Sequence, residues 1–73
     1  MSRVSYFVGD GLNSSAEDLG YSDVEWSVGD IIEVVDYDYE RERGEFTERY
    51  RIGEIGVDSD GNPYAVVYYI GEC

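Results

Sequence analysis

The chain has 73 residues and a formal net charge of −12, because 17 aspartates and glutamates face only five arginines, with no lysine and no histidine. This length allows one small domain. The charge excludes a binder of nucleic-acid phosphates, which needs clustered basic side chains, and it opposes binding to anionic membranes. Histidine-based catalysis and histidine metal sites are excluded by composition alone.

The composition predicts a folded chain despite this charge. Hydrophobic residues make up 42% and aromatic residues 15%, including eight tyrosines, whereas an acidic disordered tail would lack them. Cys73 is the only cysteine, so no internal disulfide stabilises the fold. Residues 1–11 contain no long apolar run and no cleavage motif, which favours a cytoplasmic protein without a membrane span. We expect a single domain over residues 1–73, present as a monomer.

The first half of the chain predicts two strands and one short helix. Val4, Tyr6 and Val8 alternate with Ser5 and Phe7, which predicts a first strand. Val24, Trp26 and Val28 alternate with Glu25 and Ser27, which predicts a second short strand or extended segment. Between them, Ser14 and Glu17 have the spacing of a capping box, which predicts one or two helical turns near residues 15–19. A helix of this length is not stable without packing.

The second half predicts a meander of three antiparallel strands, over residues 31–35, 46–57 and 64–70. A two-residue turn at Gly44-Glu45 gives a ladder of opposite charges, while Asp60-Gly61 is a strong signal for the second hairpin. The expected charge pairs are Arg41 with Glu48, Glu40 with Arg49, and Asp38 with Arg51. The second hairpin would place Val57 opposite Tyr64 and Ile55 opposite Val66. With the first strand at an edge, the fold class is mainly β (α+β), an antiparallel sheet of about four strands.

Two segments resemble small SH3-like barrels. Residues 27–34, Ser-Val-Gly-Asp-Ile-Ile-Glu-Val, are similar to an opening strand preceded by a Gly-Asp pair, and residues 51–57 are similar to the middle strands. This resemblance covers about half of the chain and implies a partly closed sheet. It says nothing about function, because one fold hosts many functions.

The acidic residues are concentrated before the predicted hairpin arginines. Residues 4–40 hold ten acids and no base, while four of the five arginines lie within residues 41–51. We expect an uncompensated negative surface that docks a basic partner, with electrostatic steering of the encounter. A solubilising surface in a salt-adapted organism is the alternative. The candidate partner-binding residues are Asp10, Glu17, Asp18, Asp23, Glu25, Asp36, Asp38 and Glu40, together with the aromatic residues Phe7 and Tyr37.

The aromatic residues divide into core and surface candidates. We expect Trp26 in the core, whereas Phe7, Tyr68 or Tyr69 are candidates for exposed anchors of a partner, because aromatic side chains dominate binding hot spots. In the run of residues 36–40, acids alternate with tyrosines, so the two kinds of side chain point to opposite faces of an extended strand.

The sequence argues against enzymatic and metal chemistry. The serines, Thr47 and Cys73 have no histidine or lysine to activate them, and no glycine loop with a lysine could hold a phosphate. Residues 58–62 superficially match the start of an EF-hand loop, but its twelfth position would be Tyr69 rather than glutamate, so we interpret the segment as a hairpin turn. We expect no enzyme, no cofactor and no metal.

In size, charge and class, the chain resembles small acidic phage-encoded proteins that bind the host RNA polymerase. The resemblance implies a non-enzymatic regulator of transcription, which docks its acidic face on a basic patch near a nucleic-acid channel in the host cytoplasm. Two alternatives remain open. A DNA mimic would inhibit a restriction or CRISPR nuclease, and an SH3-like module would bind peptides in an aromatic groove.

Overall fold

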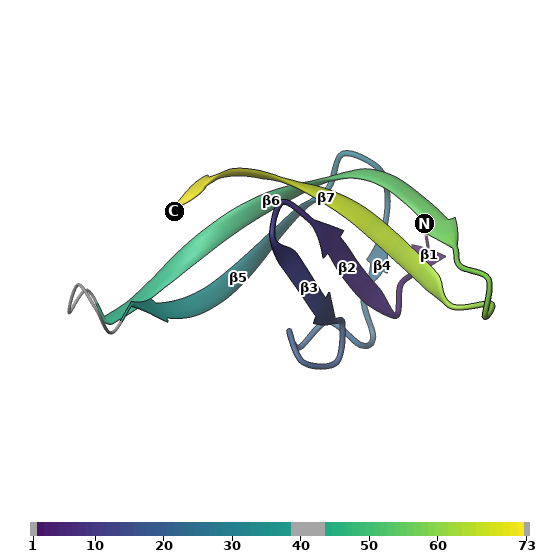
Figure 1. Ribbon diagram of the computed structural model, residues 1–73, viewed down its shortest axis with the longest axis horizontal. Coiled ribbons are helices and arrows are strands. Elements are labelled where there is room, and N and C mark those ends of the chain that lie inside the picture. Colours follow the sequence, from purple (N-terminus) through teal and green to yellow (C-terminus); the bar gives the residue numbers. More distant parts are fainter. Residues whose placement is uncertain (1, 39–43, 73) are drawn as a thin grey trace.

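The computed structural model describes residues 2–38 and 44–72 and contains only β-strands and turns in this part of the chain (Figure 1). The mainly β class is therefore confirmed. The strands are β1 (Ser2–Arg3), β2 (Tyr6–Gly9), β3 (Leu12–Ser15), β4 (Glu25–Trp26), β5 (Ile31–Asp38), β6 (Gly44–Val57) and β7 (Pro63–Glu72).

Five of these strands form one sheet, in the order β3-β2-β7-β6-β5, and β1 pairs with β4 in a separate two-stranded sheet. The β5-β6-β7 meander is antiparallel, as predicted. The prediction of a fully antiparallel sheet is wrong at one place, because β2 runs parallel to β7. Figure 1 shows β6 and β7 as a long arch with β2 and β3 beneath it, in a molecule that extends 40 Å along its longest axis.

The core lies between the inner face of this sheet and residues 16–30, which we call the cover segment. Phe7, Ile32 and Ile52 are completely buried, and Trp26 of the cover segment is 7% exposed, which confirms its predicted core position. The rings of Phe7 and Trp26 meet edge to face at 5.7 Å between centroids, an arrangement that adds to the free energy of burial.

The predicted helix near residues 15–19 is wrong. Ser14 pairs with Phe7 in the β2–β3 ladder, and Ser15 is the last residue of β3. The backbone N–H of Ala16 donates to the carbonyl of Ser5 at 2.9 Å, and turns follow over residues 16–20. Ser15 Oγ does accept a hydrogen bond from the N–H of Asp18 at 3.1 Å, so a capping interaction forms without a helix. Sheet pairing prevails because so short a helix has little stability of its own.

The predicted β5–β6 register is also wrong. Ile32 lies opposite Tyr50, both are buried, and the pairing ends where Asp38 lies opposite Gly44. Burial of this pair outweighs exposed ion pairs, each of which contributes at most about 1 kcal/mol. In the observed register, Arg49 lies opposite Glu33. The predicted turn at Gly44-Glu45 is wrong, because both residues begin β6 and lie opposite Asp38 and Tyr37. The expected pair of Asp38 with Arg51 is also wrong, since Arg51 lies opposite Ile31. The expected pairs of Arg41 with Glu48 and of Glu40 with Arg49 involve residues 39–43, which lie outside the described residues.

The second hairpin turns where it was predicted, but its register differs by one residue. Val57 lies opposite Pro63 rather than Tyr64, and Ile55 lies opposite Ala65 rather than Val66. The reason is the loop at residues 58–62, where the carboxylate of Asp58 accepts hydrogen bonds from the backbone N–H groups of Asp60 and Asn62, at 3.0 and 2.8 Å. This side chain holds a longer loop than a two-residue turn.

Candidate protein-binding surface

The cover segment presents a group of exposed carboxylates. Glu17, Asp18, Asp23 and Glu25 are all exposed, and no described polar or charged residue of the protein is buried. The cover segment contains no arginine of its own, and a described base, Arg3 of β1, lies opposite Glu25 in the two-stranded sheet and lines a pocket with Glu17. Its turns are fixed by backbone hydrogen bonds such as Tyr21 N–H to the carbonyl of Ala16, at 2.7 Å. The carboxylates are therefore displayed on an ordered surface.

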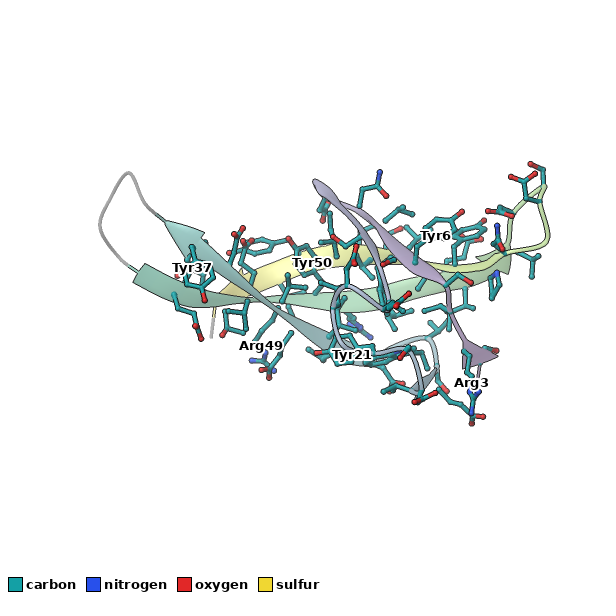
Figure 2. All side chains as sticks on the ribbon, turned by 90° about the horizontal axis from the view of Figure 1, so that it is seen from below. Arg3, Tyr6, Tyr21, Tyr37, Arg49 and Tyr50 are labelled. Carbon is teal, nitrogen blue, oxygen red and sulfur yellow. The ribbon has the colours of Figure 1, made fainter. Side chains whose placement is uncertain are left out.

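Tyr21 attaches the cover segment to strand β5. Its hydroxyl donates to the carbonyl of Glu33 at 2.8 Å and accepts from the N–H of Glu33 at 3.3 Å (Figure 2). Its ring also contacts Trp26 edge to face, with 5.2 Å between centroids. Strand β5 is an edge strand of the sheet, so Tyr21 satisfies backbone groups that no neighbouring strand reaches.

A shallow groove lies between the cover segment and the edge of β5. Its volume is about 310 Å³. Apolar side chains and two carboxylates share it, and the lining residues are Asp18, Leu19, Tyr21, Glu33, Val34 and Val35. The groove thus brings the acidic cover segment and the exposed edge strand together.

Beyond the groove, the end of β5 carries three of the predicted site residues, Asp36, Tyr37 and Asp38. Asp36 and Tyr37 are exposed, and Tyr37 is 53% exposed. The Tyr37 hydroxyl donates to Glu45 Oε2 at 3.3 Å across the hairpin. Asp38 is the last residue of β5, its side chain is not described, and Glu40 lies outside the described residues.

Two predicted site residues lie elsewhere. Phe7 is completely buried, so its prediction as an exposed anchor is wrong. The error follows from the choice of face on β2, because Phe7 rather than its neighbours points to the core. Asp10 lies in the β2–β3 turn, where its Oδ2 accepts a hydrogen bond from the N–H of Tyr69 at 2.8 Å. Tyr68 and Tyr69 are 53% and 43% exposed, as expected for candidate anchors.

Arg49 and Arg51 do not have the cross-strand partners that the sequence predicted for them. Arg51 lies between Ile31 and Tyr68 in the sheet register, not opposite an acid. Arg49 lies opposite Glu33, yet its Nε atom is buried without a hydrogen-bond partner. Among the described residues, the predicted pair of Asp38 with Arg51 does not form.

The loop at residues 58–62 has a structural role. The backbone N–H of Asn62, which donates to the Asp58 carboxylate, lowers the pKa of that carboxyl group. The hydroxyl of Tyr6 donates to Asp58 Oδ2 at 2.9 Å, and this bond raises the pKa of Tyr6. Across residues 2–38 and 44–72, no group of three or more acidic or cysteine side chains could hold a metal ion.

The groove depends on residues that the sequence did not single out. Tyr21 and Leu19 were not candidates, and Glu33 was only one acid of the acidic stretch. No periodicity marks a tyrosine that bonds to a distant edge strand.

The part of the chain that the structure describes has no helix that could span a membrane. In comparisons with known proteins, no protein family, no curated protein and no solved structure matches the chain.

Proposed function

We propose that this protein binds a basic surface of a nucleic-acid enzyme and regulates it without catalysis, with RNA polymerase as the best candidate. The observation that carries the proposal is the exposure of four carboxylates on a cover segment that has no basic residue of its own, with Arg3 of β1 opposite one of them, Glu25. They are Glu17, Asp18, Asp23 and Glu25. The chain also resembles the phage-encoded regulators named above in size, charge and class, and this resemblance supports RNA polymerase as the target.

The physical basis is long-range attraction followed by close contact. A surface of one charge sign increases the association rate with an oppositely charged surface by about 10-fold to 1,000-fold at low salt. Enzymes that hold nucleic acids have basic channels, so a rigid acidic domain complements them. Phe7 of the sheet packs against Trp26 of the cover segment, and this contact holds the cover segment in place. Its carboxylates therefore keep a fixed arrangement, which lowers the entropic cost of binding.

The test is transcription by purified bacterial RNA polymerase from a linear promoter template. We expect the wild-type protein to reduce or redistribute transcripts, and the variant D18N/D23N to do so less effectively. The matched control is E54Q/D60N, which also removes two exposed carboxylates but from β6 and from the loop at its end. Transcription unaffected by a large excess of the wild-type protein would overturn the polymerase proposal.

A competition assay separates this proposal from DNA mimicry. If the protein docks outside the DNA channel, duplex DNA leaves its binding to the polymerase unchanged. Full competition would instead favour the DNA-mimic alternative, in which carboxylates occupy phosphate positions.

A further inference from the structure

The open edge of strand β5 has backbone groups without a strand partner. β5 is the last strand in the sheet order and pairs only with β6. Tyr21 bonds to both the N–H and the carbonyl of Glu33, which shows that these two groups point away from β6. Because a strand repeats every two residues, the N–H and the carbonyl of Val35 point the same way.

The surroundings of Val35 suit an added strand. Val35 is 54% exposed and lines the groove beside Leu19 and Val34, so an added extended segment would find the N–H and the carbonyl of Val35 together with an apolar contact there. Natural sheets protect long edges with bulges, prolines or charged side chains, and on β5 the Asp36 carboxylate accepts a hydrogen bond from the N–H of Tyr37 at 2.8 Å, so the backbone groups of Val35 lie between two protected positions. Tyr21 protects the backbone groups of Glu33, and its two hydrogen bonds go to Glu33 rather than to Val35.

The charge around the groove determines the kind of strand. Asp18 and Glu33 line it, and Asp36 follows on β5. A second copy of this chain would bring another net charge of −12 to the same place and is disfavoured by repulsion. An extended segment that alternates basic and β-branched residues would match the carboxylates, the apolar lining and the backbone groups together.

We propose that the edge of β5 at Val35, with the groove lined by Asp18, Leu19 and Glu33, binds an extended basic segment of a partner protein by β-strand addition. The inference rests on the proposed function in one respect, since it assumes that the partner is basic. It adds the mode of recognition, in which backbone hydrogen bonds give affinity and the groove selects side chains.

The test uses a fluorescein-labelled peptide, Thr-Lys-Val-Arg-Val-Lys-Thr, with blocked ends, and measures fluorescence anisotropy. The informative variant is Val35→Pro. Proline removes the N–H that points to the open edge, and it is tolerated on edge strands because the ladder to β6 does not use that group. We expect the affinity of this variant for the peptide to fall by about tenfold or more. The matched Val35→Ala variant keeps the N–H, and we expect its affinity to stay within about twofold of the wild type. Equal affinity of V35P and V35A would overturn the inference.

A second measurement does not depend on the folding of the proline variant. Two-dimensional ¹H–¹⁵N NMR of the wild-type protein follows each backbone amide during peptide addition. We expect slower hydrogen exchange at the Val35 amide and no comparable change at Asp60. Changes confined to the loop at residues 58–62 would overturn the inference, and so would equally strong binding of a control peptide with glutamate in place of lysine and arginine.

The two proposals fail separately. If the polymerase does not bind but the peptide protects Val35, only the proposed enzyme target is lost. If the polymerase binds V35P and V35A equally well, strand addition is lost while the acidic-docking proposal remains.

Discussion

The two ends of the long sheet differ in how their residues are held. At the body end, Phe7 and Ile52 of the sheet are completely buried and form one core with Trp26 of the cover segment. At the other end, the arm, which we define as residues 34–38 of β5 with residues 44–48 of β6, has no buried residue among its described side chains. Strand pairing holds the arm, while side-chain packing holds the body. Figure 1 shows β5 and β6 extending away from β2 and β3 at this end. The buried residues of the body therefore determine the register of β5 with β6, and the arm continues that register.

The largest expected effect breaks the body. Phe7→Ala removes a completely buried ring and its edge-to-face contacts with Trp26 and Tyr21. We expect a loss of about 3–5 kcal/mol in the free energy of unfolding, which leaves a domain of this size marginal or unfolded. The matched substitution in the arm, Val35→Ala, should cost less than about 1 kcal/mol. Urea denaturation followed by tryptophan fluorescence measures both, and similar losses at the two sites would contradict the division into body and arm.

The next effect concerns the junction of β2 and β7. Gly9 has a φ of +132°, and a Cβ atom there would collide with the backbone of Val67. Gly9→Ala is expected to cost about 2 kcal/mol or more, because neither the strain nor the clash can relax without moving the strand. Gly11→Ala is the control, since its φ is +88° but the space around it is open. Thermal unfolding of the two variants should give a clearly lower midpoint for Gly9→Ala, and the reverse order would show that the parallel β2–β7 contact is wrong.

A smaller effect is expected where the body meets the edge of β5. Tyr21→Phe removes the hydroxyl that bonds to both backbone groups of Glu33. We expect a loss of about 1 kcal/mol in the free energy of unfolding, because water replaces the lost hydrogen bonds. The same change lengthens the open edge, so it should also strengthen binding of the basic peptide. Weaker peptide binding in a folded Tyr21→Phe protein would indicate that the ring position matters more than the free edge.

The smallest expected effect concerns the pH dependence of stability, through the Asp58 carboxylate. The folded protein lowers the pKa of Asp58 below its ordinary value of 3.8, chiefly through the N–H of Asn62. The ionised carboxylate therefore stabilises the fold above that ordinary value, and this contribution is lost as the pH falls through the lower, folded-state pKa. Asp58→Asn should flatten the dependence of the unfolding midpoint on pH below that value. Asp60→Asn is the control, and an unchanged slope in Asp58→Asn would remove the assigned role.

The same contrast explains which features were predictable from the sequence. Strands β5, β6 and β7 were expected because long runs of β-branched and aromatic residues mark them, and Trp26 was expected in the core. The pairing of strands was not predictable from charge alternation, because Ile32 and Tyr50 gain more from burial than arginines gain from exposed partners. The local helix signal at Ser14 and Glu17 is overridden by the pairing of β3 with the preceding strand β2, where Ser14 lies opposite Phe7.

The candidate site was predicted in part. Four acids of the cover segment were named from the sequence, and the structure leaves all four exposed: Glu17, Asp18, Asp23 and Glu25. The groove was missed because it needs Tyr21 to meet Glu33, a contact over twelve residues that no local pattern encodes. Phe7 was assigned to the surface because a strand alternation alone does not say which face is covered.

The proposed attraction between the acidic cover segment and a basic partner is tested most directly by the salt dependence of binding to purified RNA polymerase. Biolayer interferometry of the wild type, D18N/D23N and E54Q/D60N is run from about 50 to about 500 mM NaCl, a range over which screening becomes strong. We expect wild-type affinity to fall by about tenfold or more over this range, and D18N/D23N to start weaker than E54Q/D60N and converge with it at high salt. Wild-type affinity that does not change with salt, or equal affinity of the two variants at low salt, would contradict the proposal.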